Sequence, residues 1–161
     1  MSLRLTDLIS CLLAAGVLFG CRPEATQPAK TPTIEHSLNR PPLPPALQAN
    51  QDACDKSDLT ACVTLAIVLF EGKEVAVDHE RARALFDQAC AGANARGCNG
   101  LGNLYMMIEP KDPTRALGLF GRACDANEPH ACSNLGSAYY NGTGVPRDSA
   151  RAAFFLDRAC T

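Results

Sequence analysis

The stretch Ala123-Cys124-Asp125-Ala126-Asn127-Glu128-Pro129-His130-Ala131-Cys132 decides the fold, because its pattern recurs along the chain. It holds two cysteines separated by seven residues, and the same spacing occurs in two earlier pairs, Cys54/Cys62 and Cys90/Cys98. An Ala-Cys dipeptide opens each pair. A fourth dipeptide ends at Cys160, and the successive intervals are 36, 34 and 36 residues. A fixed period of this length predicts a solenoid in which each unit stacks on the preceding one.

The residues before each Ala-Cys dipeptide predict an amphipathic helix. In the first full unit, apolar side chains at positions 82, 85, 86, 89 and 90 follow the i, i+3, i+4, i+7, i+8 spacing of one helical face. An aspartate stands twelve positions before the cysteine in each unit, and its carboxylate can cap the first turn. These aspartates are Asp78, Asp112 and Asp148. Pro113 falls at the first helical position, which favours proline.

A second helix is expected to begin just before the second cysteine of each pair. Within it, Ala66, Gly102 and Gly136 occupy one equivalent position. Glycine inside a helix costs about 1 kcal/mol relative to alanine, so its repetition indicates that the partner helix approaches closely there. Residues 45–54 match the end of the first kind of helix and predict an N-terminal capping half-repeat. The expected order is this half-repeat followed by three helix pairs, seven short helices in all.

This pattern resembles the Sel1-like repeat family, a relative of the tetratricopeptide repeats. The residues that carry the resemblance are Leu135-Gly136, Tyr139, Gly142, Gly144-Val145, Asp148, Ala152 and Ala159. The chain is more similar still to the cysteine-rich branch first described as secreted Helicobacter cysteine-rich proteins, in which Cys-x7-Cys pairs recur with each repeat. The resemblance covers about residues 46–161. It implies an all-α solenoid of Sel1-like, tetratricopeptide-like helix pairs.

The paired cysteines are expected to form disulfides. The first cysteine ends one helix, the second begins the next, and a tight turn between antiparallel helices brings them to the separation that a bridge requires. The predicted bridges are Cys54–Cys62, Cys90–Cys98 and Cys124–Cys132. Reduced cysteines in place of alanine are the main alternative. Zinc and exchange-type redox sites fit less well, because the spacing is too wide for zinc pairs and no Cys-x-x-Cys is present.

Cys160 has no partner at the expected spacing within this sequence. We expect either a free thiol or a disulfide-linked homodimer through Cys160, and a relic of a lost repeat is an equally good interpretation.

The first 21 residues are interpreted as a lipoprotein signal peptide. Arg4 precedes an apolar run from Leu8 to Gly20, whose helical length of about 20 Å is short of a bilayer core. The segment ends Leu18-Phe19-Gly20-Cys21, which resembles a bacterial lipobox and implies acylation at Cys21. An ordinary secretory signal is the alternative. Arg22 after the cysteine favours the outer membrane, facing the periplasm or cell surface. Residues 22–45 contain seven prolines and are expected to form a tether.

The function expected from these features is binding rather than catalysis. The net charge of −2 gives no reason to expect nucleic acid as a partner. No catalytic constellation, metal-ligand set or cofactor motif was found in the sequence. In the resembled family the second helix type lines the concave side, which places Asn99, Asn103, Asn134 and Ser137 on a surface for a protein or peptide partner. Simple solvation of these polar side chains is the alternative.

The predicted function is therefore a lipid-anchored, disulfide-stapled adaptor of the bacterial envelope. The resemblance also implies a second function, because penicillin binding and weak β-lactamase activity have been assigned to the cysteine-rich branch. A purely structural envelope protein is the third.

Overall fold

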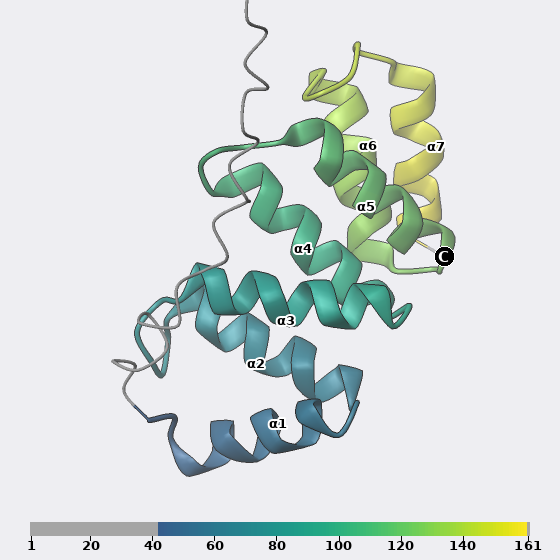
Figure 1. Cartoon of the computed structure of the whole chain (residues 1–161). Helices are drawn as coiled ribbons and strands as arrows, with labels where there is room; N and C mark the ends of the chain where they lie inside the picture. The colour runs from purple at the N-terminus through teal and green to yellow at the C-terminus, as the bar shows by residue number, and fades with distance from the viewer. Residues whose placement is uncertain (1–41, 161) are drawn as a thin grey trace, which may run out of the picture. The chain divides into compact units, whose positions relative to one another are not determined.

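The computed structural model describes residues 42–160, and these residues form seven α-helices and no strand (Figure 1). The predicted signal segment, Cys21 and the tether as far as Pro41 lie outside the described residues. In chain order the helices are α1 (Pro45–Asp55), α2 (Leu59–Glu71), α3 (His79–Ala91), α4 (Ala95–Met107), α5 (Pro113–Asp125), α6 (Pro129–Asn141) and α7 (Ser149–Ala159). Each helix packs against the next one in the chain. The α2–α3, α4–α5 and α6–α7 pairs are the three predicted repeats, and α1 is the predicted half-repeat, so the all-α repeat fold is confirmed.

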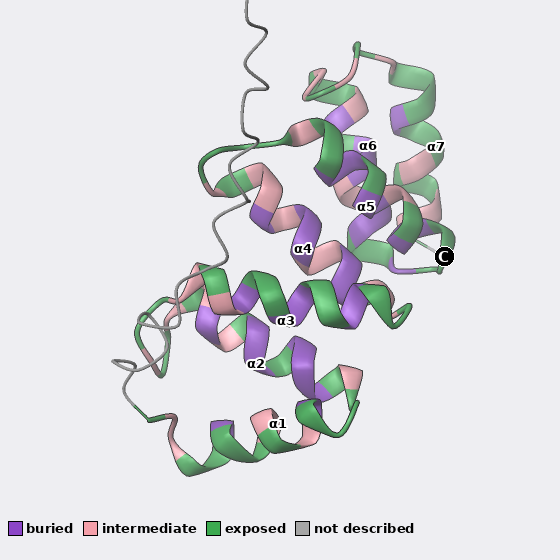
Figure 2. Ribbon diagram, viewed as in Figure 1, coloured by how far each residue is buried: buried purple, intermediate pink, exposed green. Residues whose placement is uncertain are grey.

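The core is one cluster of buried residues drawn from the packed helices, and along each helix the buried residues alternate with exposed ones (Figure 2). All five residues of the stripe predicted in α3 are buried. Close approach at the repeated glycines is also confirmed. A Cβ atom at Gly102 would lie 2.6 Å from the ring of Phe120 in α5, and one at Gly136 would lie 2.8 Å from Leu156 in α7. Real Cβ atoms do not pack at such distances, so these glycines let the two helices of a repeat meet.

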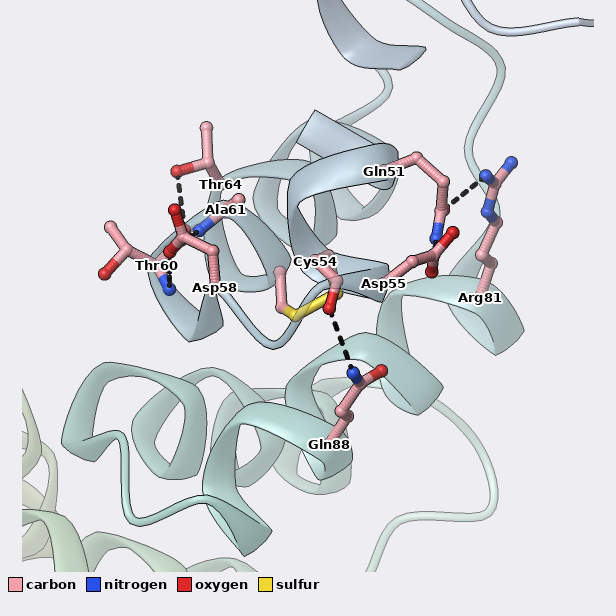
Figure 3. The surroundings of a disulfide bond; sticks show 10 residues. Gln51, Cys54, Asp55, Asp58, Thr60, Ala61, Thr64, Arg81 and Gln88 are labelled. Carbon is pink, nitrogen blue, oxygen red and sulfur yellow. Dashed lines mark hydrogen bonds between the residues drawn. A yellow bond between two sulfur atoms is a disulfide. The ribbon is translucent and has the colours of Figure 1, made fainter. Parts of the chain in front are cut away.

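The turn between one repeat and the next has almost no length, because one residue serves both helices. The N–H of Asp58 donates to the carbonyl of Ala53 at the end of α1, and its carboxylate accepts from Thr60 and Ala61 at the start of α2 (Figure 3). Asn94 and Glu128 hold the same place in the later turns. The residue just before each of them has a positive φ, as left-handed helix ends require. These residues are Ser57, Ala93 and Asn127.

The predicted aspartate caps are confirmed at the starts of α3, α5 and α7, whereas the caps of α2, α4 and α6 were not predicted. Asp78, Asp112 and Asp148 each accept a 2.9 Å hydrogen bond from an N–H of the first turn of α3, α5 and α7. However, α2, α4 and α6 begin two residues earlier than the sequence indicated, because their caps stand four positions before the second cysteine. These extra residues place the second cysteine of each pair inside the first turn of its helix, and the first cysteine lies near the end of the preceding helix, as predicted.

Candidate binding groove

A disulfide joins the two helices on either side of each short turn. The structure contains Cys54–Cys62, Cys90–Cys98 and Cys124–Cys132, with Cα–Cα separations of 4.7, 4.5 and 4.7 Å. These are the pairs that the sequence predicts. All six cysteines are buried, with at most 3% of any residue exposed. Each bridge therefore joins the end of one repeat to the start of the next inside the core.

A second link between repeats uses the carbonyl of the first cysteine of each pair. The Gln88 amide donates to the carbonyl of Cys54 over 3.4 Å (Figure 3). Arg122 donates to the carbonyl of Cys90 over 3.4 Å, and Arg158 donates to that of Cys124 over 2.8 Å. Each of the three donors stands immediately before the next Ala-Cys dipeptide, two positions before its cysteine. The stack therefore repeats the same side-chain-to-backbone contact at each junction.

A groove of about 360 Å³ runs across α2, α4 and the start of α6. These are the helices that begin near the second cysteine of each pair. The groove lining comes from these three helices, with Phe86 of α3 contributing from beneath. The lining residues are Val63, Ile67, Phe70, Glu71, Phe86, Arg96, Asn99, Gly100, Asn103, Glu128 and His130. This is the helix type that the sequence analysis placed on the binding face.

Three of the four predicted binding residues lie together. The Nδ2 group of Asn134 in α6 donates to Oδ1 of Asn99 over 3.0 Å and to Oδ1 of Asn103 over 3.1 Å. Asn99 and Asn103 line the groove. Ser137 is exposed and is not part of the groove lining. The structure thus joins the asparagines into one cluster across two repeats and leaves Ser137 outside it.

The two carboxylates of the groove already have partners. Glu71 is 2.8 Å from Nζ of Lys73, and this contact raises the pKa of Lys73, mainly through the hydrogen bond and then through the charge. Glu128 is the buried cap of α6, and its Oε1 lies 2.8 Å from Nδ1 of His130. Arg96 makes no hydrogen bond or ion pair with another described residue. Arg96 therefore supplies a cation to the groove that no neighbouring carboxylate neutralises.

The apolar half of the groove was not predicted from the sequence. Val63 and Ile67 stand at the repeat positions of Asn99 and Asn103, so aligning the repeats position by position would have shown that the first repeat replaces both amides with aliphatic side chains. Tyr105 and Tyr139 are partly buried against the core. Their rings contact Arg115 and Arg151, whose guanidinium carbons lie 4.5 and 5.4 Å from the ring centroids.

The thiol of Cys160 is free and exposed. No group of three His, Cys, Asp or Glu side chains within residues 42–160 is arranged to hold a metal ion. Among the seven helices described, none has the length and apolar composition needed to cross a bilayer.

Comparisons with known proteins agree with this architecture. A family model described as Sel1 repeat matches residues 60–94, 95–128 and 129–161, which are the three helix pairs. The structure is similar to c5321, a protective antigen present in uropathogenic Escherichia coli strains, with 27% identity and a TM-score of 0.66. That match covers 71% of this chain but only 25% of the antigen, so the chain spans a quarter of its length.

Two further solved structures resemble this chain. A Sel1 repeat protein from Oxalobacter formigenes has 25% identity and a TM-score of 0.59, and the match covers 71% of this chain and 88% of that one. The Helicobacter pylori cysteine rich protein B shares the fold at 23% identity and a TM-score of 0.56, with 71% and 84% of the two chains covered. No curated protein matches the sequence. Three matched repeats account for more than half of the residues, and the chain belongs to the Sel1 repeat family.

Proposed function

We propose that this protein is an exported, lipid-anchored adaptor of the bacterial envelope that binds a protein or peptide partner in the groove across α2, α4 and α6. The observation that carries the proposal is the groove itself, in which side chains from all three repeats meet. Stacked helix pairs use such extended surfaces for binding. The amides of Asn99 and Asn103 suit this role, because a side-chain amide can bond to the backbone of a partner.

Export and anchoring are supported by independent features. Disulfides persist in oxidising compartments, and the described residues contain three buried bridges. The apolar segment that ends at Cys21 supports a lipid anchor, and Arg22 favours the outer membrane. The exposed thiol of Cys160 is available to form a disulfide-linked homodimer.

The adaptor function is tested by crosslinked capture of the tagged protein from its own envelope. The bait variants are Asn103→Lys, which fills the groove, and Ser137→Lys, which adds the same charge outside it. We expect a partner that is recovered by the wild type and by Ser137→Lys but is lost with Asn103→Lys, and that binds the purified protein with the same dependence. Equal recovery of the partner by all three baits would show that the partner does not bind in the groove. Turnover of a chromogenic cephalosporin by the purified protein would favour the hydrolase instead.

Anchoring and dimerisation have separate tests. Labelled palmitate should be incorporated into the wild type and not into Cys21→Ser, and label on that variant would contradict acylation at Cys21. A non-reducing gel should show a dimer that disappears with Cys160→Ser, whereas a monomer alone in both samples would contradict the dimer.

A further inference from the structure

The groove has one apolar and one polar half, because the repeats differ at two equivalent positions. The first repeat has Val63 and Ile67, the second has Asn99 and Asn103, and the third has serine at both places. The positions lie one helical turn apart, so each pair lies on the same side of its helix. The difference between the halves therefore comes from the sequence of individual repeats, on a backbone that all of them share.

The apolar half can hold a large side chain. Val63, Ile67 and Phe70 of α2 line it, and Ile67 is 37% exposed although it is aliphatic. On the α4 side, Gly100 lies against the ring of Phe86, and a Cβ atom at Gly100 would collide with that ring. The absence of a side chain at Gly100 leaves Phe86 as part of the groove wall. An apolar group that enters here is surrounded by carbon atoms from α2 and α3.

The polar half presents hydrogen-bond donors. Asn99 and Asn103 use their Oδ1 atoms to accept from Asn134, and within the described residues their Nδ2 groups have no partner. Arg96 adds a guanidinium group, and the nearby carboxylates of Glu71 and Glu128 are occupied by Lys73 and by His130 with the first turn of α6. The complementary ligand group is therefore an acceptor with negative charge.

We propose that the groove selects an extended peptide in which a large apolar residue and an aspartate or glutamate stand three positions apart. This inference rests on the proposed binding function. The apolar side chain packs against Val63, Ile67 and Phe70, and the carboxylate accepts from Arg96, Asn99 and Asn103. Neighbouring helix axes lie about 8–10 Å apart, and an extended peptide advances about 3.3 Å per residue, so three positions span the distance between α2 and α4.

The test uses short labelled peptides and fluorescence polarisation with the disulfide-intact protein. The probes contain Phe-Ser-Gly-Asp and the reverse order Asp-Gly-Ser-Phe. Matched peptides replace Phe with Ala or Asp with Asn. We expect one of the two orders to bind, and either replacement to weaken binding at least tenfold.

Two variants assign the two halves of the groove. Ile67→Asn gives the first repeat the amide of the second, and it should abolish the preference for Phe over Ala while keeping the preference for Asp over Asn. Arg96→Gln should abolish the preference for Asp over Asn while keeping the preference for Phe over Ala. Ser137→Asn, outside the groove, should change neither preference, and circular dichroism establishes that all three variants are folded.

The outcomes separate this inference from the function on which it rests. If neither peptide order binds, or if the preferences survive in both variants, the proposed selectivity is overturned. If an envelope partner depends on Asn103 but its bound segment lacks an apolar and an acidic residue at this spacing, the adaptor function stands and the selectivity fails. If no peptide binds and no partner depends on the groove, both fail.

Discussion

The backbone carbonyl of Cys124 accepts a 2.8 Å hydrogen bond from the guanidinium group of Arg158, which lies one repeat further along the chain. Arg158 also contacts the carboxylate of Asp125 at 3.3 Å. The same carbonyl belongs to a cysteine that is bridged to Cys132 in α6. One residue therefore connects α5 to α6 through its side chain and to α7 through its backbone.

We expect Arg158→Met to destabilise the protein by about 1 kcal/mol. A hydrogen bond with a charged partner is worth about 1.5–3 kcal/mol, and the value is reduced here because 30% of the Arg158 side chain is exposed. Urea unfolding of the disulfide-intact protein measures the change. Arg122→Met, which removes a 3.4 Å bond, should cost less. Arg96→Met, which removes no hydrogen bond or ion pair between described residues, should cost close to nothing, and an equal loss in all three variants would contradict the junction bond.

Gly102 and Gly118 should respond to the same substitution with opposite signs. Gly102→Ala places a methyl group against the buried ring of Phe120 and should cost about 1–3 kcal/mol. Nothing lies within 4 Å of a Cβ atom at Gly118, which is in the middle of α5, so Gly118→Ala should stabilise the protein by up to about 1 kcal/mol. Thermal unfolding of the two variants compares them directly. Stabilisation by Gly102→Ala would show that α4 and α5 do not meet at this glycine.

Ala93 has a left-handed backbone with φ of 65°, which is unfavourable for a residue with a Cβ atom. The left-handed conformation costs an alanine about 1–2 kcal/mol, which glycine does not incur. Glycine lowers the stability by about 0.5–1 kcal/mol in turn, because it loses more conformational entropy on folding. Ala93→Gly should therefore stabilise the protein by about 0.5 kcal/mol. Ala84→Gly makes the same chemical change at an exposed site inside α3 and should cost about 1 kcal/mol. Equal destabilisation by both would contradict the turn geometry.

Alkylation under native conditions should label Cys160 and none of the six paired cysteines, because among the seven cysteines within residues 42–160 only Cys160 has a free, exposed thiol. Mass spectrometry before and after reduction counts the protected thiols. Replacing both Cys90 and Cys98 with alanine should cost about 2.6 kcal/mol, which is the chain-entropy value for closing a nine-residue loop. Labelling of any paired cysteine without reductant would contradict the bridges.

Asn134→Asp should reverse the hydrogen-bond polarity of the groove. An aspartate accepts but does not donate, so Asn99 and Asn103 would turn their Nδ2 groups toward it and present oxygens to the ligand instead. We expect at least a tenfold loss in affinity for an acidic peptide and a smaller loss for its Asn-substituted form. Asn141→Asp adds the same charge at an exposed site outside the groove lining and should leave affinity unchanged. Equal losses in the two variants would assign the effect to net charge.

The repeat fold follows from the sequence because three signals agree with one another. The aspartate caps locate the starts of α3, α5 and α7, the cysteine pairs locate the turns between repeats, and the period places both signals in every unit. The caps of α2, α4 and α6 were missed because they differ in type. Asp58, Asn94 and Glu128 share a position and a role but not a side chain, so no repeated letter marks them.

The groove was predicted only in part for a related reason. Asn99, Asn103 and Asn134 attract notice as polar residues on an expected binding face, and the structure brings them together. Val63 and Ile67 look like core residues in a helical pattern, and Val63 is indeed buried while Ile67 is partly exposed at the groove. Whether an aliphatic side chain faces the core or a ligand depends on how the neighbouring repeat is rotated, and hydrophobic periodicity alone does not contain that angle.

The contact that joins successive repeats has a consequence for how such chains change in evolution. Its acceptor is a main-chain oxygen, which every residue type possesses, and the donor is glutamine at one junction and arginine at two others. A unit that is duplicated in the gene therefore meets a compatible surface on whichever unit precedes it. Repeats can be gained, lost or reordered without substitutions that restore this hydrogen bond between repeats. The side chains that line the groove can then diversify independently of the contacts between repeats.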